Sequence, residues 1–280
     1  MASLHLTRMD SSLFTLHSSL KSLWSRLLAA FSFFTRLPFW RLGHIQSEHY
    51  KRVVALWPLV GWFTGGVTVL VFLLAHAVMP CAFSLLLAFT VRVLLTGALH
   101  EDGLADFFDG FGGGTTRERT LEIMKDSHIG TYGVMGLIIY FLMLFWVGYN
   151  IIVCTEFVYG IGFVCYALFA ADTFGKWAAS QIVNFLPYAR TAEQAKNKFV
   201  YERMSVGEVL VGALFGWAPT LLFFQFAAGL VAVVAMVAAG LMMLLMWRRL
   251  KGYTGDCCGA TMLVSELVYL IVMGALVCSH

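Results

Sequence analysis

The chain concentrates its carboxylates in one stretch. Seven of its 16 acidic residues lie between His100 and Asp126, where the sequence begins HEDGLADFFDGFGGG and is bordered by long apolar runs. They are Glu101, Asp102, Asp106, Asp109, Glu118, Glu122 and Asp126. Such a concentration indicates either a site that holds a cation and moves a proton or a solvated acidic helix end.

Asp102, Asp106 and Asp109 have the spacing of one helical face. At about 100° per residue, their directions differ by only about 60°. Three anions on one face repel one another, and a bound cation would relieve that repulsion. Mg²⁺ prefers carboxylate oxygens, often one or two of them together with water and substrate phosphate. We therefore predict these three aspartates as Mg²⁺ ligands.

A triple glycine and several basic residues follow the aspartates. Gly112 and Gly113 would let backbone N–H groups approach a ligand closely. Arg117, Lys125 and a protonated His128 are suitable donors to phosphate oxygens. Together with the aspartates they predict a metal–diphosphate site that stabilises charge on a transferred phosphoryl group. A flexible turn with ordinary membrane-flanking charges is the simpler interpretation.

Two further polar segments follow or precede apolar runs. NFLPYAR ends in Arg190, and KGYTGDCCGA contains Asp256 between glycines. We expect Arg190 to contact the same diphosphate. Asp256 has three open roles, as a turn residue, as a helix N-cap or as a ligand.

The composition requires a membrane. Of the 280 residues 60% are hydrophobic and 12% are charged, against about 25% charged residues in a soluble domain. The charges are grouped, which leaves apolar runs long enough to cross about 30 Å of hydrocarbon as helices. We predict an all-α polytopic helix bundle in a lipid bilayer, with about seven transmembrane helices. They are expected near 53–78, 82–100, 133–154, 157–180, 206–226, 228–247 and 259–278.

The basic residues give the bundle an orientation. Of the 19 Lys and Arg residues, 18 fall on one side of this division, including Lys176, which is counted at the end of the fourth expected span. The positive-inside rule makes that side cytoplasmic. The N-terminus and the acidic stretch are then cytoplasmic, and the C-terminus lies outside. The remaining cation, Arg92, lies inside an expected span and is either a structural ion pair or part of a polar cavity.

The ends of the chain and its cysteines add less. Residues 1–23 read as a polar N-terminal extension, and 24–280 as one integral-membrane catalytic domain. Just after the extension, LWSRLLAAFSFFTRLPFW is apolar but interrupted by charges and a proline, which is typical of an interfacial or re-entrant helix. The six cysteines show no metal-ligand spacing, and we expect them to pack as small hydrophobic residues.

Five segments, in order, resemble the cobalamin synthase family, also called adenosylcobinamide-GDP ribazoletransferase. They are FFTRLP at 33–38, HEDGLADFFDGFGGG at 100–114, LEIMKDSHIGTYGV at 121–134, LPYAR at 186–190 and GYTGDCCGA at 252–260. The resemblance covers roughly residues 25–278.

The resemblance implies a reaction. The 3′-hydroxyl of α-ribazole, or of its 5′-phosphate, attacks the diphosphate of adenosylcobinamide-GDP, and GMP leaves. The family requires Mg²⁺ and resides in the bacterial cytoplasmic (inner) membrane. Combined with the residues above, this predicts Arg36, Lys125 and Arg190 on the diphosphate oxygens. Either Asp106 or Asp126 would accept the proton of the attacking hydroxyl.

Two other functions compete with this one. A CDP-alcohol-type phosphotransferase also uses an aspartate stripe, but the fuller pattern of that family, with its arginine, is absent from this stretch. A small-solute transporter would carry polar residues through several spans to the far side. We expect small-molecule substrates and no nucleic acid as partners, and the sequence leaves a homo-oligomer open.

Overall fold

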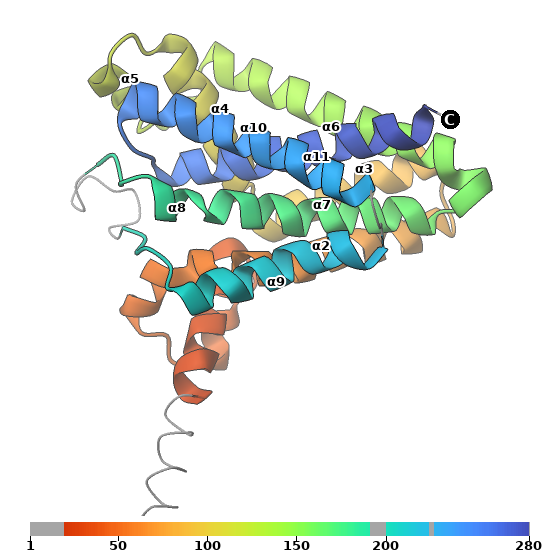
Figure 1. The fold of residues 1–280 in the computed structure, drawn as a ribbon, viewed down its shortest axis with the longest axis horizontal. Coiled ribbons are helices and arrows are strands. Elements are labelled where there is room, and N and C mark those ends of the chain that lie inside the picture. Colours follow the sequence, from red (N-terminus) through yellow and green to blue (C-terminus); the bar gives the residue numbers. More distant parts are fainter. Residues whose placement is uncertain (1–19, 191–199, 224–226, 280) are drawn as a thin grey trace, which may run out of the picture.

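The protein is a bundle of helices. The computed structural model describes residues 20–190, 200–223 and 227–279, and within these ranges it contains helices and one isolated bridge but no strand. The long helices, shown in Figure 1, are α2 (Trp57–His76), α3 (Cys81–Thr96), α4 (Leu99–Gly113), α6 (Thr131–Tyr159), α7 (Gly162–Ser180), α9 (Val206–Phe223), α10 (Ala227–Leu250) and α11 (Gly255–Cys278). The short ones are η1 (Phe39–Leu42), η2 (Ser47–Leu56), α5 (Arg117–Ile123) and α8 (Ile182–Phe185). The predicted all-α membrane bundle is confirmed.

Fewer helices than predicted are long and apolar enough to cross a bilayer alone. Four qualify in the described ranges, and the bent pair α3–α4 makes a fifth if it counts as one span. Helix α9 is shorter than these helices. Helix α7 carries two charged residues, Asp172 and Lys176, in its C-terminal half. Because α7 packs against α2, α9 and α11, protein rather than lipid covers its polar groups. Within the described residues each of the seven expected segments is mostly helical, but their count as seven separate spans is not confirmed.

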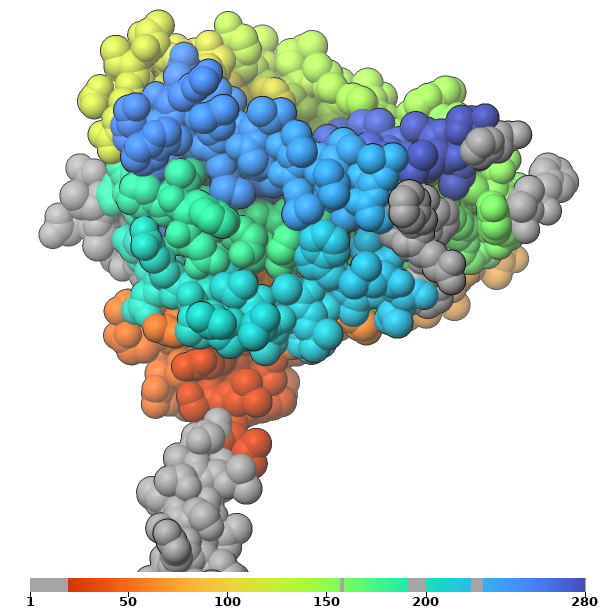
Figure 2. All heavy atoms as spheres, viewed as in Figure 1, coloured from red at the N-terminus to blue at the C-terminus, as the bar shows by residue number. Residues whose placement is uncertain are grey.

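The chain before α2 forms a helix of its own. Residues 20–34 are helical, so the helix begins before the predicted boundary at residue 23, and residues 1–19 lie outside the described ranges. Figure 1 shows this first helix in red, roughly perpendicular to the long helices, and Figure 2 shows it projecting from one flank of the bundle. That orientation favours the interfacial interpretation over a span.

Helix α4 reaches its position through a sharp bend. α3 and α4 meet at 87°, and the two residues at the corner, Gly97 and Ala98, both have left-handed backbones with φ of 67° and 56°. A side chain on Gly97 would collide with Arg36, so glycine suits both the backbone and the space there. The bend turns the aspartate-bearing helix across one end of the bundle.

The charges inside the bundle are paired with one another. Arg92 forms an ion pair with Glu266 and donates to the Tyr140 hydroxyl at 3.1 Å. Lys176 is paired with Asp172 on the same helix. Arg92 is therefore a structural ion pair, one of the two roles left open by the sequence. Lys176, which the sequence places at the end of the fourth expected span, is 1% exposed and lies inside the protein, so it does not belong with the basic residues of the charged side.

A disulfide closes the opposite end of the bundle. Cys154 at the end of α6 and Cys278 at the end of α11 are joined, with their Cα atoms 5.3 Å apart. The expectation that all cysteines pack as small apolar residues is wrong for these two, because 124 residues separate them in sequence and only the fold brings them together. Cys81, Cys165, Cys257 and Cys258 are free thiols.

Candidate functional site

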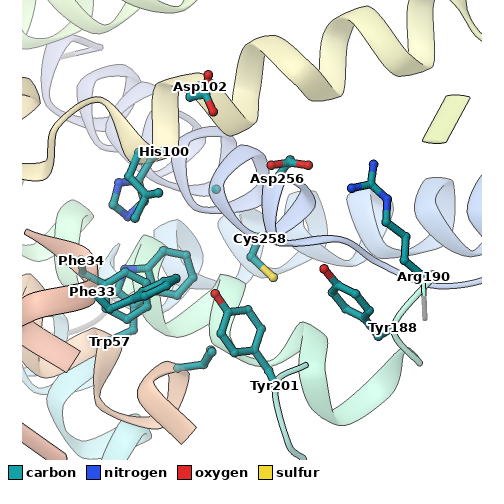
Figure 3. A pocket seen from close by; sticks show the side chains of 14 residues that line it. Phe33, Phe34, Trp57, His100, Asp102, Tyr188, Arg190, Tyr201, Asp256 and Cys258 are labelled. Atoms are coloured by element: carbon teal, nitrogen blue, oxygen red, sulfur yellow. The ribbon is translucent and has the colours of Figure 1, made fainter. Parts of the chain in front are cut away.

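A pocket opens at the end of the bundle that carries the predicted site residues. It has a volume of about 170 Å³ and is lined by segments distant in sequence: the first helix, α2, α4, the chain after α8 and the start of α11. Figure 3 shows Asp102, Asp256 and Arg190 along one side and a group of rings on the other. The pocket thus has a charged rim and an aromatic wall.

Asp102 and Asp256 line the same pocket because two helices touch at a glycine. A Cβ on Gly103 would lie 2.9 Å from the carbonyl oxygen of Asp256, so only glycine lets α4 approach the start of α11 this closely. Thr254 is the N-cap of α11 and accepts from the Cys257 N–H. The N-cap role considered for Asp256 is therefore wrong, and its carboxylate lies in the first turn, on the rim of the pocket.

Arg190 is held by a short piece of extended pairing. Tyr188 and Tyr253 form the isolated bridge, in which the Ala189 N–H donates to the Tyr253 carbonyl at 2.8 Å. This pairing joins the two polar segments that the sequence singled out. The Arg190 guanidinium donates to the Leu121 carbonyl at 2.8 Å and is mostly buried. It is thereby anchored at the edge of the pocket.

The aromatic wall is a cluster of rings in contact. The rings of Phe34 and Trp57 are nearly parallel with centroids 4.8 Å apart, and the Trp57 and His100 rings follow at 5.4 Å. Phe33 meets Tyr201 edge to face at 6.2 Å. Neither Trp57 nor Tyr201 was predicted as a site residue, and no spacing in the sequence connects them.

Two phenols at the floor of the pocket keep their protons. Burial raises the pKa of Tyr188 to about 12 and raises the pKa of Tyr201 well above its ordinary value. Near neutral pH both hydroxyls can therefore donate a hydrogen bond as well as accept one.

Asp109 has a structural partner. One of its oxygens accepts the Gly130 N–H at 2.7 Å and the other accepts the Gly133 N–H at 2.8 Å. These amides belong to the first turn of α6, so Asp109 satisfies donors that a helix start leaves unpaired. The carboxylate of Asp109 ties α4 to α6.

The three aspartates share a face of α4 but do not converge. In the described part of the chain, no three His, Cys, Asp or Glu side chains are placed to hold a metal together. The reason is helical rise, which separates residues seven apart by about 10 Å. Asp102, with Asp106 one turn away or Asp256 across the pocket, still offers the one or two carboxylates that Mg²⁺ takes beside a phosphate. These oxygen donors fit the ion, whereas Asp109 would have to share oxygens already bound to amides.

A second hollow lies beyond Asp109. Its volume is about 520 Å³, and its lining includes Gly113, Asp126 and His128. The N–H of His128 donates to Asp126 at 3.0 Å, and this hydrogen bond, with the imidazole beside it, lowers the pKa of Asp126. Asp106, on α4, lines neither the first pocket nor this hollow, so the two predicted proton acceptors lie in different surroundings.

The remaining predicted residues either make structural contacts or are exposed to solvent. Arg117 donates to the carbonyls of Leu250 and Ala189, each at 2.7 Å, and so clamps α5 to two other segments. Gly112 faces the Tyr132 ring, which a side chain there would strike. Arg36 and Lys125 are exposed and do not line the pocket. The phosphate contacts expected of these residues stay predictions.

One basic residue outside the prediction also shapes the site. Arg249, near the end of α10, donates to the carbonyls of Phe111 at 3.1 Å and Gly114 at 2.5 Å. It thereby satisfies carbonyls at the end of α4. The Thr116 side chain caps α5 by accepting from the Arg119 N–H.

The fold and pocket define a polytopic helical membrane protein with a charged, aromatic-walled site at one end. The chain belongs to a known family of that kind: the cobalamin-5-phosphate synthase model matches residues 26–274. It is 35% identical over 247 residues to the adenosylcobinamide-GDP ribazoletransferase of Shewanella baltica, covering 88% of this chain and 92% of that one. The enzyme of the same name from Vibrio cholerae is 36% identical over 250 residues, covering 89% and 93%. No solved structure matches this chain.

Proposed function

We propose that this protein is an adenosylcobinamide-GDP ribazoletransferase, which joins α-ribazole or its 5′-phosphate to adenosylcobinamide-GDP and releases GMP. The observation that carries the proposal is spatial. Four of the five segments through which the sequence resembles the family contribute residues to one pocket, although more than 200 residues separate the first from the last. They contribute Phe33, Phe34, His100, Asp102, Tyr188, Arg190, Gly255, Asp256, Cys258 and Gly259.

The charged rim suits a diphosphate. Arg190 would contact phosphate oxygens with the part of its guanidinium that does not face Leu121. Asp102 and Asp106 would hold Mg²⁺, with Asp256 opposite, and the bound ion would neutralise charge on the diphosphate. Of the two predicted proton acceptors we propose Asp106, because it lies one turn from Asp102 on α4. Positioning and charge neutralisation are expected to supply most of the rate, as in other phosphoryl transfers.

We also propose the bacterial inner membrane as the location, with the pocket facing the cytoplasm. The distribution of Lys and Arg supports this orientation. The disulfide supports it independently, because Asp256 and Cys278 stand at opposite ends of α11, about 33 Å apart by helical rise. Disulfides persist in oxidising compartments, so the end with Cys278 is expected outside. A reporter fused after Gly114 should then read cytoplasmic, and one at the C-terminus should read outside.

No observation favours the other two functions. The family match and the pocket at one end of the bundle both argue against a transporter. Arg92, Glu266, Asp172 and Lys176 are paired with each other rather than arranged along a path. The aspartate stripe alone carried the likeness to CDP-alcohol phosphotransferases, and Asp109 at its end is engaged with α6.

The test is an assay on the purified full-length protein in lipid nanodiscs. Adenosylcobinamide-GDP, α-ribazole and Mg²⁺ should yield GMP and the joined corrinoid, and EDTA should stop the reaction until Mg²⁺ is restored. Replacing α-ribazole by a CDP-alcohol acceptor pair should give no product. GMP release that survives thorough chelation would remove the metal from the proposal, and absence of GMP under all conditions would overturn the function.

A further inference from the structure

The aromatic wall has no role in the diphosphate chemistry above. Phe33, Phe34 and Trp57 lie on one side of the pocket and the charged groups on the other (Figure 3). Val54 and Leu99 add further apolar lining. Such a wall offers flat apolar surface and adds nothing to binding a phosphate. Its chemistry is that of a platform on which a planar ring stacks.

Two buried nitrogens at this wall have no partner among the described residues. His100 Nε2 and Trp57 Nε1 are inaccessible to solvent, and neither has a hydrogen-bond partner in the part of the chain that the structure describes. His100 is 3% and Trp57 is 2% exposed. Burying a donor without an acceptor is costly, so a ligand whose polar atom meets either nitrogen after a small side-chain rotation would remove that cost.

The size of the pocket limits what enters it. About 170 Å³ is well below the roughly 300–1,000 Å³ of sites that enclose a drug-sized molecule. One bicyclic base fits such a space, whereas a corrin does not. The entering group is therefore one base of a substrate, with the rest of that substrate at the rim.

We infer that the aromatic wall binds the benzimidazole base of the acceptor nucleoside, α-ribazole. This inference rests on the proposed function. The base is flat, apolar and bicyclic, and its unsubstituted ring nitrogen is an acceptor suited to an N–H of His100 or Trp57. Its ribose would then extend to Asp102 and Asp256, where the attacked diphosphate is expected. The pocket thereby positions the acceptor, with its base against the rings and its attacking hydroxyl at the charged rim.

The guanine of the other substrate is the competing occupant. Its edge carries an oxygen and several N–H groups, and a wall built from Phe33, Phe34 and Val54 would leave most of them unpaired. Both bases can stack on aromatic rings, so binding measurements must show which of the two the wall holds. Two variants probe the wall without opening the core, Phe33→Leu and Tyr201→Leu, because both positions are half-buried.

Phe31→Leu is the matched control. Phe31 lies on the same helix as Phe33 and contacts Phe39 and Phe63 instead of the pocket. Calorimetry on the full-length protein in nanodiscs would measure α-ribazole and GMP binding separately. We expect each wall variant to weaken α-ribazole binding by about tenfold, the effect of losing one stacking ring. GMP binding should be unchanged, and the control should match the wild type.

The outcomes separate this inference from the proposed function. Wall variants that weaken GMP binding and spare α-ribazole would assign the wall to guanine and overturn the inference, while turnover by the wild type would leave the function standing. Variants that change neither affinity would also overturn it. In turnover, a rise in KM for α-ribazole alone, with kcat kept, is the supporting result. His100→Phe, which removes the nitrogen and keeps a ring, should weaken α-ribazole binding as well.

Discussion

The protein uses the same kinds of charged residue in two different ways, inside the bundle and at its end. Inside, Arg92, Glu266, Asp172 and Lys176 form two ion pairs in contact, all at most 4% exposed. At the end, Asp102 and Asp256 are accessible and stand on the rim of a pocket. A buried charge must be paired to be tolerated, whereas a rim charge keeps the capacity to bind a substrate. The type of residue therefore says less about its role than its access to solvent.

The largest effect should follow from breaking the interior group. Glu266→Ala leaves Arg92 buried beside Tyr140 without its carboxylate, and we expect a loss of about 3–5 kcal/mol of stability. Thermal unfolding of the detergent-purified protein measures it. Glu156→Ala, an exposed glutamate near the end of α6, is the control. Combining Arg92→Met with Glu266→Leu should recover most of the loss, and an unchanged unfolding temperature in Glu266→Ala would contradict the structural role.

A rim change should do the opposite and spare the fold. Asp102→Asn keeps the shape of the side chain and removes the charge, so we expect turnover to fall by about 100-fold or more. The unfolding temperature should not change, because Asp102 is exposed. Glu118→Asn, at an exposed position on α5, is the control for loss of a nearby acidic charge. Turnover within a few-fold of the wild type would remove Asp102 from the site.

Asp109 shares features with both the interior charges and the rim charges, and a substitution there tests which of the two groups it belongs to. Asp109→Asn removes charge-assisted acceptors from the Gly130 and Gly133 amides, and a capping loss of about 1–2 kcal/mol is expected. Turnover should fall only as far as the folded fraction does. If turnover is lost with unfolding unchanged, Asp109 belongs to the rim and binds the metal after all.

The smallest effect is expected at Asp126. Its pKa is lowered in the folded protein, so any stability it contributes is present above its unfolded pKa and is lost as the pH falls through the folded value. Asp126→Asn should leave turnover near pH 7 within about tenfold, whereas losing a general base costs about 10²–10⁴. The paired measurement is Asp106→Asn. A larger loss at Asp126 than at Asp106 would move proton acceptance to the second hollow.

The sequence alone determined the class of the protein and the end of the bundle at which we predict the site. Apolar runs fix helices in lipid because backbone groups have no other partners there, and the basic loops select one end. The spacing of Asp102, Asp106 and Asp109 predicted a helix with a shared face, and α4 has it. We expected Arg190 at the diphosphate and left a ligand role open for Asp256, and both line the pocket.

Only the tertiary structure decided which residues meet. The Gly97–Ala98 bend and the contact at Gly103 bring Asp102 to Asp256, and the Tyr188–Tyr253 bridge brings Arg190 beside them. Asp109 binds α6, Lys176 is interior and Cys154 reaches Cys278, each against what its neighbours in sequence suggested. The physical reason is common to all: periodicity and charge describe one element at a time, while a pocket, an ion pair or a disulfide depends on how separate helices cross.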